Sequence, residues 1–375
     1  MLQSFARSLG EGRIEKLRDG TKIFILSHFG GNPVVKDEHL GIEGAVFNPG
    51  ASLFENKVML LPRVHWGYQK KKVFDEKLGV ERWIMENYIS QVWVLYSEDG
   101  KNFKRYDNVV IKSEEKDFKY GIEDIRIVKF KDFYLLCGCG KLIPPFKGSG
   151  GDRVAIYTTR DFKEIKYHGI IKEFDSRNAF PFHREINGKL LMFFRFHPNI
   201  HLCVLEEGVE QLLNPEKYSK LYQKIFEERE KSLLIKAGEF PHEHEKVGAG
   251  VPVIETEKGF LFIYHAVGEY PEELCEIYGI KERIKRGYSI CAALLDPENP
   301  QKVIKRTKYP IYIAHKPYEL FGGDGFEVDV PCVNFPVGYV QIGDKILLYC
   351  GAGDKYVVLL SFSLQKLIDY LWNLS

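Results

Sequence analysis

A short pattern recurs five times along the 375-residue chain and constrains the fold more than any other feature. In each copy a turn precedes a run of apolar residues, which ends at a polar residue suited to chemistry. The copies span residues 57–63, 132–138, 188–195, 259–265 and 344–354. A long-period repeat of short strands is typical of a solenoid or a propeller.

A second recurring element precedes each copy by about ten residues. These elements span residues 47–50, 123–126, 177–180, 246–249 and 330–334, and four of them carry polar groups where a strand is expected to begin. Five units that place polar residues at matching positions predict a ring whose axis gathers them into one pocket.

Three units continue with a further strand that ends at an Asp-bearing turn, at residues 93–103, 154–162 and 290–297, and then with an outer strand. Four strands per unit is the composition of a propeller blade. We therefore predict an all-β fold, a five-bladed β-propeller with helical insertions and a C-terminal helix, as a single domain over residues 1–375. The N-terminal extension is expected at 1–30, the helical insertions at about 215–235 and 270–287, and the C-terminal helix at about 364–373.

Charge and cysteine content narrow the function class. Lys and Arg number 53 against 52 Asp and Glu, so no general field attracts nucleic acid or an anionic membrane. No stretch approaches the ~20 apolar residues of a membrane span. The seven cysteines, an odd number without a secretory signal, favour reduced thiols, and we expect a cytoplasmic location.

The stretch Glu123-Asp124-Ile125-Arg126 is the leading candidate for catalysis. Strand alternation predicts that the two carboxylates point to opposite faces and that Arg126 shares the face of Asp124. Taken alone, the stretch is better explained as a salt-bridged strand end. Polar residues at equivalent places in other units change this interpretation; they are Arg63, Arg177, Asn178, Arg195, His201 and Lys246. Cations that face one another across an axis repel unless an anion binds between them.

These residues resemble a known family. From about Asn32 to Phe362 the chain is similar to the inverting β-mannoside phosphorylases and β-mannosidases of glycoside hydrolase family 130, which are five-bladed propellers. The similar stretches are 47–51, 123–126, 180–188, 264–265, 293–297 and 349–354. The resemblance implies that Asp124 is the sole catalytic acid. It implies a substrate-binding set of Asn48, Arg63, Glu123, Arg126, His265 and Asp354, and a phosphate-binding set of Arg177, Asn178, Arg195, His201, Lys246 and Tyr288.

The resemblance also implies a mechanism. Asp124 would protonate the glycosidic oxygen by way of the sugar 3-hydroxyl, while phosphate attacks the anomeric carbon from the opposite face and yields α-mannose 1-phosphate. The partners would be a small carbohydrate and inorganic phosphate, with no cofactor and no nucleic acid or membrane. Because members of the family are often oligomeric, the helical insertions are candidate subunit contacts in a homo-oligomer.

The sequence departs from the family pattern at two places, so two alternatives to a phosphorylase remain open. Gln91 stands where many family phosphorylases carry a phosphate-binding Arg, and the run 180–188 is altered. An inverting β-mannosidase with the same acid is the first alternative; it needs a second carboxylate to activate water, for which Glu243 or Glu245 is the candidate. A non-catalytic propeller that binds sugar or protein is the second. The His-x-His of residues 242–244 suggests a metal, but no partner ligand is evident, and we expect none.

Overall fold

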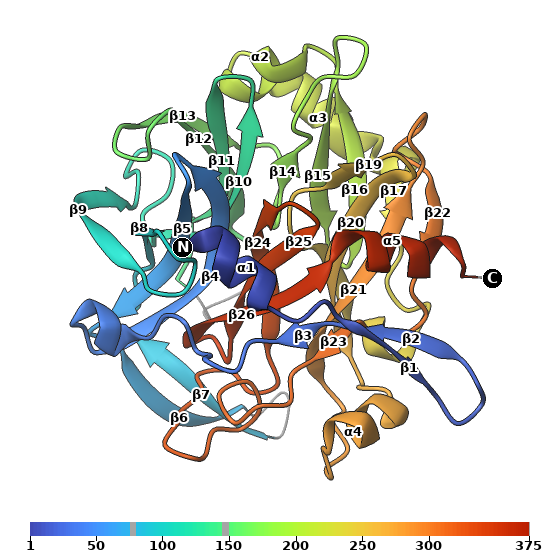
Figure 1. The fold of residues 1–375 in the computed structure, drawn as a ribbon. Coiled ribbons are helices and arrows are strands. Elements are labelled where there is room, and N and C mark those ends of the chain that lie inside the picture. The colour runs from blue at the N-terminus through green and yellow to red at the C-terminus, as the bar shows by residue number, and fades with distance from the viewer. Residues whose placement is uncertain (76–79, 145–149, 375) are drawn as a thin grey trace.

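Five antiparallel sheets follow one another along the chain in the computed structural model, which describes residues 1–75, 80–144 and 150–374 (Figure 1). From the inner strand outward, the first three are β4 (Gly44–Phe54), β5 (Lys57–Trp66), β8 (Gln91–Ser97) and β9 (Lys104–Ile111); β10 (Ile122–Phe130), β11 (Phe133–Lys141), β12 (Asp152–Thr159) and β13 (Ile165–Ile171); and β14 (Phe180–Pro181), β15 (Leu190–Phe196), β16 (Asn199–Leu205) and β17 (Leu233–Ile235).

The last two sheets complete the ring. The fourth comprises β18 (Lys246–Ala249), β20 (Gly259–Gly268), β21 (Gly287–Leu295) and β22 (Val303–Arg306), with β19 (Ile254–Thr256) on β20 and β23 (Tyr312–Ile313) on β21. The fifth comprises β24 (Asn334–Ile342), β25 (Lys345–Ala352), β26 (Tyr356–Ser363) and β3 (Ser27–His28). The inner strands β4, β10 and β24 are in mutual contact. The predicted five-bladed β-propeller is confirmed.

The repeated apolar runs form the second strand of each blade, and the first copy shows why they are continuous. Val58, Met59, Leu60 and Leu61 on β5 are all fully buried. A strand packed on both faces has no solvent side, so its sequence is apolar throughout and does not alternate. The turn into β5 falls at Glu55 and Asn56, whose φ angles of 46° and 60° suit a tight hairpin between twisted strands.

The N-terminal segment is more than the extension predicted for residues 1–30. It begins with α1 (Leu2–Ser8) and a hairpin of β1 (Arg13–Lys16) and β2 (Lys22–Ile25), but its last strand, β3, pairs with β26. β3 thereby becomes the outer strand of the fifth blade. This pairing joins the first and last parts of the chain and covers the edge of β26 that would otherwise be unpaired.

The helical insertions are shorter than predicted. The segment expected as one helix over 215–235 follows α2 (Gly208–Leu213) and contains α3 (Ser219–Glu227) and the 3₁₀ turn η2 (Arg229–Ser232). Its final apolar residues form β17, because they complete the third blade against β16. The segment 270–287 contains α4 (Glu272–Tyr278), which ends at Gly279 with a φ of 72°. The predicted C-terminal helix is confirmed as α5 (Leu364–Trp372), capped by the Ser363 hydroxyl.

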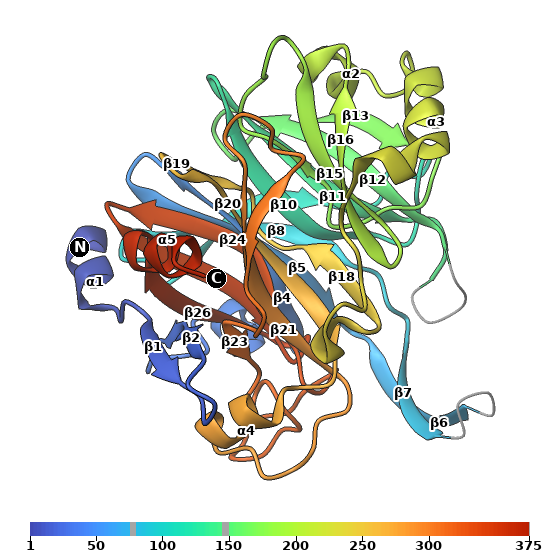
Figure 2. The ribbon, with the colours of Figure 1, turned by 90° about the vertical axis from the view of Figure 1, so that its right-hand side faces the viewer.

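One hairpin leaves the ring. β6 (Gln69–Asp75) and β7 (Val80–Glu86) pair only with each other between β5 and β8, and Figure 2 shows them extending away from the blades. A 3₁₀ turn, η1 (Asp37–Leu40), precedes the first blade. Among the described helices, none is long and apolar enough to cross a membrane. All seven cysteines are buried free thiols.

Candidate active site

The acid pair lies where β10 begins, at a β-bulge. The pairing register with β11 shifts between Glu123 and Arg126, and Asp124 has a φ of 51°. A bulge inserts an extra residue and redirects the neighbouring side chains. The prediction that the two carboxylates point to opposite faces is therefore wrong. Both contact the same two arginines, Arg63 and Arg177.

These arginines come from the blades on either side of β10. Arg63 on β5 donates from Nη2 to Glu123 Oε1 at 2.8 Å and from Nη1 to Asp124 Oδ1 at 3.4 Å. Arg177, just before β14, donates from Nη2 to Glu123 Oε2 at 3.0 Å and to Asp124 Oδ2 at 2.9 Å. Each acid side chain is only 2% exposed. Buried carboxylates need such compensation, so three blades must assemble before this pair is stable.

Two further predicted residues approach Asp124. Asn48 on β4 donates from Nδ2 to Asp124 Oδ1 at 2.9 Å. A Cβ at position 351 would lie 1.8 Å from Asn48 Oδ1, so only Gly351 permits this approach of blades one and five. Asp354, shortly after β25, lies within electrostatic range of both Asp124 and Arg63.

The two aspartates differ in charge state. Burial by itself raises the pKa of Asp124, but the surrounding guanidinium groups and the Asn48 hydrogen bond outweigh burial, and the pKa lies below its ordinary value. For Asp354, burial raises the pKa to about 7; the negative charges of Asp124, Asp329 and Glu123 act in the same direction. At neutral pH Asp124 is therefore ionised, whereas Asp354 is partly protonated.

Most of the predicted phosphate-binding residues lie together beside this pair. Arg195 on β15 donates from Nη1 to Asn178 Oδ1 at 3.0 Å. Lys246 at the start of β18 lies over the Tyr288 ring, 5.4 Å from its centroid. His265, predicted to bind the sugar, stacks on Tyr288 at 5.9 Å, and both of its ring nitrogens are buried without a partner. Burial lowers the pKa of His265, and four cations lower it further: Arg195, Arg126, Lys246 and Arg177.

Arg126 does not present its guanidinium to a substrate. The side chain is 1% exposed and donates to three main-chain carbonyls: from Nη1 to Asp124 O at 2.8 Å, from Nε to Gly250 O at 3.2 Å and from Nη2 to Ala249 O at 3.3 Å. It also packs on the Phe335 ring. We therefore correct the predicted role: Arg126 supports the backbone of Asp124 and ties blade two to blade four.

His201 is also placed elsewhere. It pairs with Phe194 across β15 and β16, while Arg195 pairs with Ile200. Directly paired residues share a face of the sheet, so His201 and Arg195 point to opposite faces. The His201 Nδ1 lies 2.9 Å from the Arg229 carbonyl oxygen, to which it donates, and its ring contacts Phe196. His201 accordingly lies against the helical insertion, away from the cation group.

Sequence reasoning missed two residues around Arg63. His65 Nε2 accepts from Arg63 Nε at 3.0 Å, and the Tyr88 hydroxyl contacts Arg63 Nη2. Burial and the Arg63 charge lower the pKa of His65 well below its ordinary value, so the ring is neutral and can accept this bond. The signal for His65 was present, because residues two apart on a strand share a face. No local pattern pointed to Tyr88.

One group of three potential metal ligands is found within the described residues: His242, Glu243 and Cys291, whose ligand atoms lie within 4.8 Å of one another. Glu243 Oε1 already accepts from the Tyr264 hydroxyl at 3.0 Å and pairs with Arg306. A guanidinium beside this carboxylate repels a cation. His244, the other half of the His-x-His, is exposed. We interpret this group as a structural ion pair in blade four.

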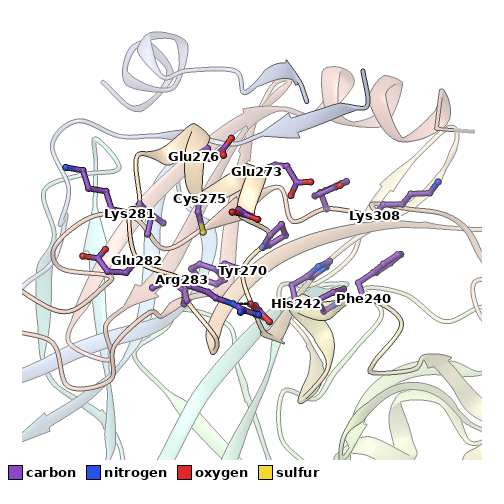
Figure 3. Close-up of a pocket in the computed structure, with 17 residues that line it drawn as sticks. Phe240, His242, Tyr270, Glu273, Cys275, Glu276, Lys281, Glu282, Arg283 and Lys308 are labelled. Carbon is purple, nitrogen blue, oxygen red and sulfur yellow. Dashed lines mark hydrogen bonds and ion pairs between the residues drawn. The ribbon is translucent and has the colours of Figure 1, made fainter. Parts of the chain in front are cut away.

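A cavity of about 890 Å³ lies beside α4 and the 3₁₀ turn η3 (Pro241–Glu243) (Figure 3). Its lining is mixed in charge, with Glu273, Glu276, Lys281 and Lys308 around Tyr270 and His242. None of the predicted site residues lines this cavity. We therefore locate the candidate active site at the acid pair rather than here.

Comparison with known proteins bears on the family of the chain rather than on the position of its site. Residues 27–373 match the family model of glycoside hydrolase family 130, described as beta-1,4-mannooligosaccharide phosphorylase. The beta-1,2-mannobiose phosphorylase of Thermoanaerobacter sp. (strain X514) is 26% identical over 347 residues, covering 89% of this chain and 96% of that protein. The 1,2-beta-oligomannan phosphorylase of the same organism is 28% identical, covering 72% and 77%.

A solved structure shares the fold. The beta-1,2-mannobiose phosphorylase from Listeria innocua, in complex with beta-1,2-mannobiose, superposes with a TM-score of 0.68 at 22% identity. The match covers 92% of this chain and 99% of that one. At this level of identity the likeness establishes the propeller architecture alone.

Proposed function

The chain belongs to glycoside hydrolase family 130, and from this premise we propose that it cleaves β-linked mannosides with inorganic phosphate. The reaction inverts the anomeric centre and gives α-mannose 1-phosphate and a shortened acceptor. Manno-oligosaccharides and mannosyl-glucose are the substrate class. Phosphate is a co-substrate, and no cofactor is required.

The grouping of Arg177, Arg195 and Lys246 beside Asp124 carries this proposal. An arginine fork pairs with two phosphate oxygens at once, and lysine adds a point charge. His265 supplies two buried ring nitrogens without partners in the same group. An anion bound there would relieve the repulsion among these cations.

The glutamates considered as the water-activating base of a hydrolase are each paired with an arginine. Both oxygens of Glu123 are held by arginines. Glu243 is paired with Arg306, and Glu245 accepts from Arg286 at 2.6 and 2.9 Å. An inverting hydrolase requires a free second carboxylate to activate water, whereas phosphate arrives already ionised. These contacts favour phosphorolysis over the β-mannosidase alternative.

The roles follow from position. Asn48, Arg63 and Asp354 surround Asp124 and hold the sugar whose bond is cleaved; Asp354, partly protonated near pH 7, can donate to a sugar hydroxyl as well as accept. Asp124 provides the proton for the leaving oxygen through the sugar 3-hydroxyl. Phosphate on Arg177, Arg195 and Lys246 attacks the anomeric carbon from the opposite face.

Reverse synthesis tests the proposal. The protein is incubated with α-mannose 1-phosphate and a panel of acceptors, and released phosphate is measured. β-1,2-linked products are sought first, because the relatives above are named for that linkage, and β-1,4 products in parallel. We expect phosphate release that depends on the acceptor and falls ~10²–10⁴-fold in Asp124→Asn. Release of free mannose from mannosides without phosphate would support the hydrolase instead; inactivity of the wild type in both assays would support a binding propeller.

A further inference from the structure

Arg177 contacts the acid pair and also belongs to the group of cations proposed to bind phosphate. Its guanidinium contacts Asp124 Oδ2 at 2.9 Å, Glu123 Oε2 at 3.0 Å and Asp152 Oδ2 at 3.6 Å. Its side chain is 22% exposed, whereas those of the acid pair are 2% exposed. An anion that enters from solvent therefore reaches Arg177 before it reaches either acid.

The other arginine of the pair is fixed. Arg63 donates from Nε to His65 Nε2 at 3.0 Å and also contacts the Tyr88 hydroxyl, so two groups besides the acids hold its guanidinium in place. Among the described residues, the ion pairs of Arg177 are all with carboxylates. An incoming phosphate offers the same kind of oxygen and can replace them. Of the two arginines on Asp124, Arg177 is the one free to move.

A general acid must carry a proton before it can donate one, and the charges around Asp124 oppose this. With Arg63 and Arg177 both in place, the pKa of Asp124 lies below its ordinary value. The charged and titratable groups that face it are Arg63 and His65 on β5, Glu123 and Arg126 on β10, Arg177 before β14, and Asp354 after β25. Asn48 on β4 adds a hydrogen bond from its neutral amide. Of these, only Arg177 is also part of the phosphate-binding group.

We propose that phosphate, on binding, draws the Arg177 guanidinium off Asp124, and that Asp124 then takes up from solvent the proton it later donates. This inference rests on the proposed function. Burial already favours the protonated form of Asp124, and the arginine charges oppose it. Removing an opposite charge from within ~4–6 Å raises the pKa of a carboxyl by about 1–3 units, and the like charge of the bound anion raises it further. The nucleophile thereby activates the acid.

The cycle balances in protons and electrons. Solvent protonates Asp124, which passes this proton to the glycosidic oxygen as the bond between that oxygen and the anomeric carbon breaks. The leaving sugar keeps the electron pair of this bond, and a phosphate oxygen supplies the pair for the new bond. When the sugar phosphate departs, Arg177 returns to the ionised Asp124. Without phosphate Asp124 stays ionised, so water attack receives no acid assistance.

Proton uptake on anion binding tests the inference. Sulfate, whose charge does not change near neutral pH, is titrated into the protein by calorimetry in two buffers of different ionisation enthalpy; phosphate is titrated in parallel. We expect the wild type to take up protons with each anion and Asp124→Asn to bind sulfate without this uptake. Asp354 also titrates near pH 7 and its pKa depends in part on the charge of Asp124, so both proteins are compared in an Asp354→Asn background.

A second measurement needs no variant. If one proton is bound per anion, linkage requires the dissociation constant for sulfate to rise with pH, by up to about tenfold per unit. Asp152→Asn is the matched control, because it removes another carboxylate partner of Arg177 and should retain the uptake.

Each outcome decides between the proposals. Sulfate or phosphate binding by the wild type without proton uptake and without pH dependence overturns the coupling but leaves the phosphate site intact. Equal uptake in the wild type and Asp124→Asn also overturns it. Absence of anion binding, with or without mannose present, overturns both the coupling and the phosphorylase function.

Discussion

Replacing Arg126 by methionine separates a supporting role from substrate binding. Methionine keeps much of the volume but removes the donors to the carbonyls of Asp124, Ala249 and Gly250. A buried acceptor left without its donor costs about 1–3 kcal/mol, so three cost about 3–9 kcal/mol. Removing a buried guanidinium returns several kcal/mol of desolvation free energy. We expect a net loss of about 3 kcal/mol in the free energy of unfolding.

Equilibrium unfolding in urea, followed by tryptophan fluorescence, measures this loss. Arg160→Met is the control, because the Arg160 side chain is 71% exposed and its one ion pair among the described residues is with the exposed Asp132. The free energy of unfolding of Arg160→Met should stay within about 0.5 kcal/mol of the wild-type value. In Arg126→Met the kcat should fall, since the backbone of Asp124 loses its support, while KM for the mannoside changes little. Unchanged stability together with a raised KM would refute the reasoning and return Arg126 to the substrate-binding set.

Three further predictions concern single side chains. His65→Gln retains an acceptor for Arg63 Nε and should keep most of kcat, whereas the shorter His65→Asn should lose about tenfold, equivalent to about 1.4 kcal/mol; equal rates would contradict a positioning role. The raised pKa of Asp354 means that the folded state binds more protons between pH 3.8 and about 7, so its contribution to stability falls as pH rises through this window. Asp354→Asn should therefore gain stability relative to the wild type, by at most ~4 kcal/mol above pH 7, in unfolding measured against pH; a constant difference would argue against the shift. His201→Asn should leave KM for phosphate unchanged while Arg195→Met raises it; equal increases would return His201 to the phosphate site.

The repeat determined much of the fold. Each apolar run predicted a strand buried on both faces, and five such runs predicted five blades, because this pattern depends only on neighbouring residues. The charged stretch around Asp124 and the cations of the other units likewise marked the candidate site. The outer strand β3 was missed, since two residues far from their partners carry no periodic signal.

Only the tertiary structure decided how the side chains of the site are used. Alternation along β10 placed Glu123 and Asp124 on opposite faces, but the bulge brings both to the same arginines. The Arg126 guanidinium, predicted to bind the substrate, donates to three main-chain carbonyls. His201, predicted to bind phosphate, lies on the opposite face of its sheet from Arg195. The sequence alone determined which residue types return in each blade, because that follows from local spacing. Which of them meet depends on bulges and on contacts between blades, which form only when distant segments pack together.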